Sequence, residues 1–117
     1  MTRELSAKQR LLRDREGLRH RIIECFRDLH PERIILFGSA ARGEADEWSD
    51  VDLILVVPTE KRFLDRLEEA YLRWNLPVAV DILVYTPSEF QAMLAEENPL
   101  ACEAVTHGVL LYEKSPG

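Results

Sequence analysis

Three short runs of apolar, β-favouring residues set the main limit on how this chain can fold. They cover residues 33–37, 51–57 and 78–85, and each is closed by glycine or proline within two residues. Runs of this length and composition are typical of buried strands, and we expect the first two to be central strands. Helical patterns flank these runs. The sequence therefore predicts the α/β (α+β) class, with a mixed sheet of about four strands packed against helices.

The rest of the chain supplies helices and a last strand. Apolar residues between Ser6 and His30 recur at spacings of three, four or seven, which predicts an amphipathic helix that Gly17 weakens. The other expected elements are a helical turn over 39–42, a helix over 60–74 capped by Thr59, a helical region over 86–106 that breaks near Asn98, and a strand over 108–112.

The size and composition of the chain favour one globular domain. It has 117 residues, of which 46% are hydrophobic and 31% charged. We expect residues 1–117 to form a single domain, with 1–30 as an N-terminal helical segment and 113–117 as a frayed tail. The sequence holds no apolar run long enough to span a membrane and no signal-peptide core, so we expect a cytoplasmic location. Cys25 and Cys102 lie in apolar segments and are expected to be core thiols.

Charge is divided unevenly along the chain. Residues 1–42 carry ten Lys or Arg against six acids, and residues 43–117 carry five against fifteen. A general nucleic-acid binder presents an extended basic surface, so the acidic larger part argues against that class. The positive N-terminal part is explained either by a solvated helix face or by contact with an acidic partner or a phosphate.

Residues that suggest chemistry lie where the first run ends and the second begins. Gly38 lets the backbone turn tightly and approach a ligand with no Cβ in the way, and Ser39 adds a hydroxyl donor. Asp50 and Asp52 are one residue apart at the start of an extended strand, so they emerge on one face with Cα atoms about 6.6 Å apart. Taken alone, the glycine turn is common and the Asp pair is also typical of a solvated strand entrance.

A third acid, Asp81, lies inside the third apolar run. A carboxylate there is costly unless it is paired, hydrogen bonded or bound to a metal, although an edge strand that exposes alternate residues is a second explanation. If the third strand lies beside the second, Asp50, Asp52 and Asp81 converge. Three carboxylates suit the hard cation Mg²⁺, which also coordinates nucleotide phosphates.

Together these residues resemble the minimal nucleotidyltransferase (MNT) family of the DNA polymerase β-like superfamily. The family pattern is Gly-Ser, ten residues, Asp-x-Asp and a later acid on a strand, and the order of elements resembles it over nearly the whole chain. The matching residues are Gly38, Ser39, Asp50, Asp52, Asp81 and the Arg42-Gly43 pair. The chain departs from the pattern at Ala40, where many relatives carry arginine.

The resemblance implies a polymerase β-like core and a reaction that uses two Mg²⁺ ions. A nucleoside monophosphate, expected to be AMP from ATP, would pass to an acceptor hydroxyl. Asp50 and Asp52 would bridge both ions, while Asp81 would bind the ion near the acceptor and help to deprotonate it. Gly38 and Ser39 would hold the β and γ phosphates, with Arg42 as a further phosphate contact.

The family also implies a protein acceptor. Its minimal members are commonly paired with a small helical partner of the HEPN type, often a toxin, so the resemblance implies an antitoxin role for this chain. One alternative is a catalytically silent module that binds nucleotide and masks its partner. Another is transfer to a small molecule such as an aminoglycoside, for which we expect the chain to be too short unless it dimerises. A homo-oligomer is compatible with the sequence.

Overall fold

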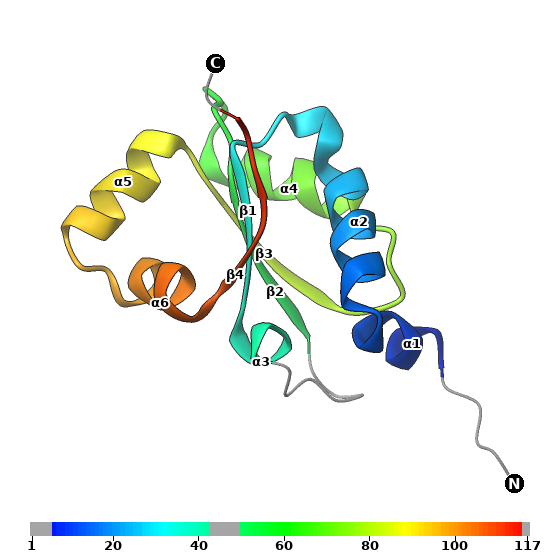
Figure 1. The fold of residues 1–117 in the computed structure, drawn as a ribbon. Coiled ribbons are helices and arrows are strands. Elements are labelled where there is room, and N and C mark those ends of the chain that lie inside the picture. The colour runs from blue at the N-terminus through cyan, green and yellow to red at the C-terminus, as the bar shows by residue number, and fades with distance from the viewer. Residues whose placement is uncertain (1–5, 43–49, 116–117) are drawn as a thin grey trace, which may run out of the picture.

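Four strands form a single mixed sheet in a computed structural model that describes residues 6–42 and 50–115 (Figure 1). The strands are β1 (Arg33–Phe37), β2 (Val51–Val56), β3 (Val80–Tyr85) and β4 (Val109–Glu113), in the spatial order β3-β2-β1-β4. β1 pairs antiparallel with β2 and β4, and β2 pairs parallel with β3. The predicted four-stranded mixed sheet is confirmed, with the first two apolar runs at its centre.

Helices cover both faces of this sheet. They are α1 (Ala7–Arg13), α2 (Arg15–Phe26), the 3-10 turn η1 (Arg27–Leu29), α3 (Gly38–Ala41), α4 (Phe63–Arg73), α5 (Pro87–Ala95) and α6 (Pro99–His107). α2 and α4 pack on one face, and α5 and α6 lie on the other (Figure 1). Within the described ranges, no helix has the length and apolar character needed to cross a bilayer.

β2 shows why the apolar runs form a sheet of this kind. Val51, Leu53 and Leu55 point into the core under α2 and α4, while Ile54 and Val56 point into the core under α5 and α6. All five are at most 3% exposed. A strand buried on both faces needs a nearly continuous apolar sequence, so a polar residue within it needs a separate explanation.

Two predicted helix boundaries were wrong for local reasons. The N-terminal helix breaks at Asp14 instead of Gly17, because the Asp14 side chain caps α2 by accepting a 3.0 Å hydrogen bond from the Gly17 N–H. α4 begins at Phe63, since the Thr59 hydroxyl accepts from the Lys61 N–H at 3.1 Å and forms a turn instead of a helix cap. Side-chain hydrogen bonds of this kind compete with helix formation.

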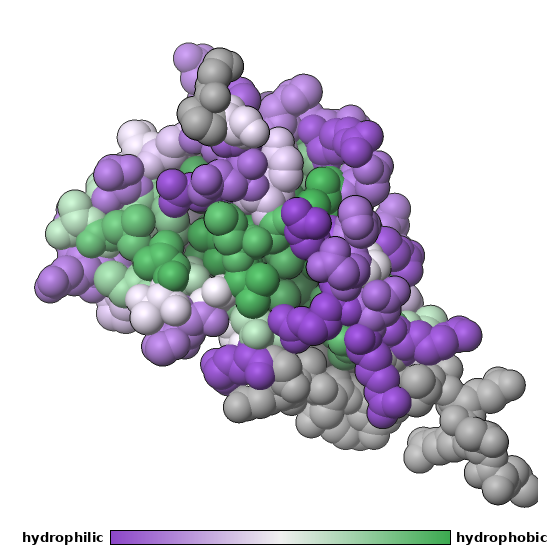
Figure 2. Space-filling view, viewed as in Figure 1, coloured by the Kyte–Doolittle hydropathy of each residue, from purple (hydrophilic) through white to green (hydrophobic). Residues whose placement is uncertain are grey.

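Exposed large apolar side chains occur in two places among the described residues. Four of them lie along α4: Phe63, Leu64, Tyr71 and Leu72. The other two, Val105 on α6 and Leu110 on β4, belong to the opposite side of the sheet. Figure 2 shows apolar side chains gathered over β4 and extending toward α5 and α6.

Side chains cap both outer edges of the sheet. On β3, the Ile82 N–H donates to the Tyr71 hydroxyl of α4 at 2.9 Å. On β4, the Leu111 carbonyl accepts from Nε of Arg19 on α2 at 2.8 Å, at the point where the register between β1 and β4 shifts. Capped edges are poor templates for pairing with another strand.

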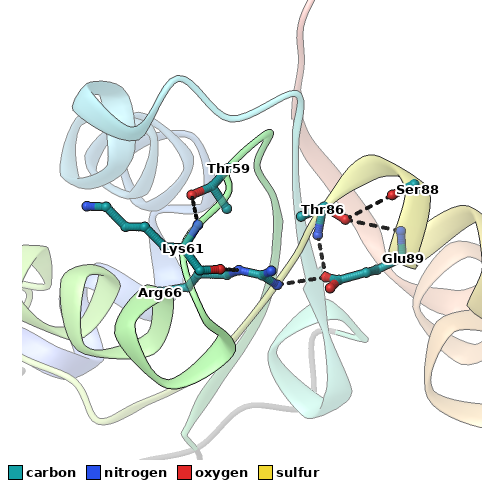
Figure 3. Close-up of polar contacts among 6 residues, drawn as sticks. All are labelled: Thr59, Lys61, Arg66, Thr86, Ser88 and Glu89. Atoms are coloured by element: carbon teal, nitrogen blue, oxygen red, sulfur yellow. Dashed lines mark hydrogen bonds and ion pairs between the residues drawn. The ribbon is translucent and has the colours of Figure 1, made fainter.

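A largely covered arginine joins α4 to α5 beyond the end of β3 (Figure 3). Nη1 of Arg66, whose side chain is only 10% exposed, donates to Oε1 of Glu89 at 2.7 Å, and its Nε donates to the Lys61 carbonyl at 2.7 Å. Glu89 also closes the capping box of α5, accepting from the Thr86 N–H at 2.8 Å. The hydrogen bond from Arg66, followed by that from Thr86, lowers the pKa of Glu89.

We expect Glu89→Gln to lower the free energy of unfolding by about 1 kcal/mol at pH 7, because it weakens both the ion pair with Arg66 and the cap of α5. The loss stays small since solvent screens this half-exposed carboxylate. Since the folded-state pKa is lowered, the contribution is present above the ordinary value of 4.5 and is lost as pH falls below it. Urea unfolding at pH 7 and pH 3 measures this. Glu68→Gln, on the exposed face of α4, is the control, and an equal loss for Glu89→Gln at both pH values would contradict the prediction.

Candidate active site

Asp52 and Asp81 face each other on neighbouring strands. The parallel register of β2 and β3 pairs them directly, at a strand spacing of about 4.8 Å. The two side chains are close enough for the negative charge of Asp81 to raise the pKa of Asp52. The third apolar run therefore does lie beside the second, which was the condition for the acids to converge.

The position of Asp52 disfavours its charged form. Burial raises the pKa of Asp52, and the negative charges of Asp81 and Asp50 raise it further. Asp52 is partly buried, whereas Asp50 and Asp81 are exposed. The sheet thus holds one carboxylate in place while two neighbours add negative charge, an arrangement that a bound cation would stabilise.

Gly38 lies directly against Asp52. β1 ends at Phe37, which pairs with Asp52, and the chain then turns at Gly38 with φ +74°. A Cβ atom at Gly38 would overlap Oδ2 of Asp52 and lie 3.3 Å from its Cγ. Both the backbone conformation and the available space therefore favour glycine here.

The turn after Gly38 is anchored by the N-terminal helices. Nη1 and Nη2 of Arg15, at the start of α2, donate to the carbonyls of Ala40 and Ala41 at 3.2 and 3.4 Å. Sequence reasoning did not single out Arg15, because its target is 25 residues away and no local pattern marks it. These contacts hold α3 against α2 and so fix where β1 turns toward the acids.

The remaining predicted residues lie at the same end of the sheet. Ser39 follows Gly38 within α3 and is partly buried, and Arg42 is exposed at the end of α3. The polar loop predicted over residues 43–49 lies outside the described residues.

The carboxylates fit a hard divalent cation in type but are not gathered into a closed set. In the part of the chain that the structure describes, no three carboxylate, imidazole or thiol side chains stand close enough to hold a metal ion. Asp52 and Asp81 form a pair. Asp50, which is exposed just before β2, raises the pKa of Asp52 through its negative charge. All three donors are carboxylate oxygens, which is the ligand type that Mg²⁺ prefers.

Comparison with known families places this geometry in context. Residues 19–106 match the family model described as the nucleotidyltransferase domain. A Methanocaldococcus jannaschii protein is 35% identical over 85 residues, covering 69% of this chain and 58% of that protein. The MntA protein of Haemophilus influenzae is 37% identical over 62 residues, covering 50% and 54%. The names of both propose protein adenylyltransferase activity, and the matches span little more than half of each relative.

Solved structures share the fold. A Sulfolobus solfataricus protein described as a proposed nucleotidyltransferase aligns with a TM-score of 0.61 at 22% identity, over 100% of this chain and 96% of that one. A toxin–antitoxin complex with AMP-PNP aligns with a TM-score of 0.59 at 26% identity, over 83% and 74%. A mutant MntA-HpeT toxin–antitoxin structure gives 0.58 at 24% identity, over 83% and 74%.

Proposed function

Because the chain belongs to the nucleotidyltransferase domain family, we propose that it transfers AMP from ATP to a hydroxyl group on a partner protein. The observation that carries the proposal is the Asp52–Asp81 pair, held in register beside a glycine that has no room for a side chain. The names of the relatives support adenylyl transfer, and a structural neighbour solved with AMP-PNP supports an adenine nucleotide as donor.

Each predicted residue has a role in this proposal. Asp50, Asp52 and Asp81 would hold two Mg²⁺ ions, which would supply positive charge to offset that of the triphosphate. Gly38 and Ser39 would hold the β and γ phosphates: the positive φ of Gly38 sets the tight turn after β1, and the Ser39 hydroxyl would donate to a phosphate oxygen. Arg42 contributes a cationic contact to the phosphates from the end of α3.

The reaction is an in-line displacement at the α phosphorus. The acceptor oxygen forms a bond to that phosphorus, the bond from it to the oxygen bridging to the β phosphate breaks, and pyrophosphate leaves with the electron pair. Asp81 is exposed on the edge strand and takes the proton of the acceptor hydroxyl. Asp52, held in β2, would fix the position of the metal ions and so of the ATP phosphates.

The acceptor in this proposal is a HEPN-type toxin, which gives the chain an antitoxin role in the cytoplasm. Two of the structural neighbours are toxin–antitoxin complexes, which supports a protein partner. Whether the chain silences such a partner by modification or only by masking it depends on the acids, and is tested by their variants.

Transfer is expected when the full chain is incubated with Mg²⁺, the protein encoded by the adjacent gene and ATP labelled in the α phosphate. The partner should become labelled from the α position and remain unlabelled from the γ position. Asp81→Asn should reduce labelling by at least about 100-fold, because it removes the proton acceptor and leaves the strand intact.

Binding of AMP-PNP, followed by calorimetry, controls for the nucleotide site. Asp65→Asn, at an exposed acid on α4, is the matched substitution and should label its partner like the wild type. Label from the γ phosphate would indicate phosphoryl transfer instead. A wild-type chain that binds AMP-PNP but labels no partner would overturn the enzymatic proposal.

A further inference from the structure

Among the described residues, the acids lie on the face of the sheet that α5 and α6 cover. Side chains alternate along a strand, so Asp52 and Asp81 project from the same face of the sheet as Ile54 and Leu83, toward α5 and α6. On the opposite face at this level, Leu36, Leu53 and Ile82 are at most 2% exposed in the core under α2 and α4. The opposite face is therefore closed to a reacting hydroxyl, and approach from the α5 and α6 side is open.

The surface that flanks this approach is apolar. Leu110 pairs with Ile35 across β1 and β4, which places it on the same face as the acids, and it is 50% exposed. Val105 on α6 is 47% exposed, and Figure 2 shows the apolar patch continuing from β4 toward these helices. Leu110 lies two strands across and two residues along from Asp52, a separation of roughly 12 Å between Cα atoms.

Pairing of a further strand does not account for the exposed Leu110. Arg19 already occupies the outward carbonyl of Leu111 on the same strand, so a strand added to β4 would have to displace a guanidinium from its 2.8 Å hydrogen bond. The occupant of the patch therefore rests on the face of the sheet and the neighbouring α6 helix.

The charge around the patch indicates the chemistry of its occupant. Residues 87–115, which contain α5, α6 and β4, carry five acids and one lysine. Glu89 and Glu113 pair with Arg66 and Arg33, so the acids that leave net negative charge on this side are the exposed Glu96, Glu97 and Glu103. A complementary protein surface has an apolar centre and a rim rich in lysine and arginine. A small polar acceptor gains nothing from an apolar surface of this kind.

We propose that the acceptor protein docks on the face formed by Leu110 and Val105, presenting its modified hydroxyl from an apolar surface with a basic rim. This rests on the proposed function and names the part of the chain that selects the acceptor. A protein docked there would contact the same face of the sheet from which Asp81 projects, so one interface could include both the docking contacts and the acceptor hydroxyl.

The test compares two lysine substitutions on opposite faces. Leu110→Lys should lower kcat/KM for the partner protein by about tenfold or more through KM, because a charge replaces an apolar contact and repels the basic rim. Its affinity for AMP-PNP should not change. Leu72→Lys on α4, where the side chain is 79% exposed, is the matched control and should transfer normally.

The outcomes separate this inference from the proposed function. If the wild type labels no partner, the proposed function fails and this docking site fails with it. If the wild type and Leu110→Lys label the partner equally well, only the docking site is overturned, and a loss confined to Leu72→Lys would assign docking to α4. Should Leu110→Lys fold poorly by circular dichroism, Val105→Lys provides the same comparison from α6. Raising the salt concentration should also increase the KM for the partner protein. Dimerisation of the chain alone through this face, detected by light scattering and lost in Leu110→Lys, would contradict the proposal.

Discussion

Asp52→Asn is expected to lose nucleotidyl transfer by about 10³-fold or more while raising the melting temperature of the protein in the absence of divalent cations. The loss follows from removing the carboxylate at the centre of the acid group, which holds charge that no other residue on β2 can replace. The gain follows from the same property, because asparagine keeps the shape of the side chain and removes the charge that burial, Asp81 and Asp50 all oppose.

The pH dependence of this stabilisation has a defined sign. The folded-state pKa of Asp52 is raised above its ordinary value of 3.8, so the folded state binds more protons and the stability of the wild type falls as pH rises through that folded-state pKa. The advantage of Asp52→Asn should therefore be small near pH 3.5 and larger at pH 7. Scanning calorimetry in EDTA measures it, with Asp65→Asn on α4 as the control substitution.

Adding Mg²⁺ with AMP-PNP should reverse the order of stability, because the ligands stabilise the wild type and bind Asp52→Asn weakly. A stability difference that is independent of pH would show that charge is not its cause. If Asp52→Asn still neutralises the partner in cells, masking of the partner, not its modification, is sufficient for the antitoxin role.

The strands could be predicted from the sequence because burial on both faces leaves a continuous apolar run, as in residues 51–57. The order of the strands in the sheet was harder to predict from the sequence. That β3 lies beside β2 follows from the helical crossover α4, but the register that pairs Asp52 with Asp81 is set by packing across the whole sheet. From the sequence alone, convergence of the acids could be predicted only if the third strand lay beside the second.

Of the two explanations offered for Asp81, the structure supports an edge strand that exposes alternate residues. β3 is an edge strand and Asp81 is exposed, so its presence in an apolar run needs no ligand. Its register position opposite Asp52, whose pKa its charge raises, is a separate feature that exposure does not explain. The contact of Arg15 with α3 escaped prediction for a different reason: a hydrogen bond between residues 25 positions apart leaves no periodic pattern.

Gly38→Ala is expected to lower the free energy of unfolding by about 2–4 kcal/mol and to abolish transfer, because it combines two separate costs. A φ of +74° is strained for any residue with a side chain, at about 1–2 kcal/mol, and the new methyl group would overlap the Asp52 carboxylate. Urea unfolding measures the total, and transfer should disappear even where the variant is fully folded.

A double-mutant cycle with Asp52→Ala separates the two costs. Removing the carboxylate removes the atoms that the new methyl group meets, so Gly38→Ala should cost only the backbone strain, about 1–2 kcal/mol, in the Asp52→Ala background. Additive costs would show that the methyl group is accommodated without moving Asp52, and the loss of transfer would then have to arise at the phosphate contacts. Coupling of the expected size would instead show that the glycine turn and the acid pair form one site, in which the shape of the turn sets the position of the carboxylate.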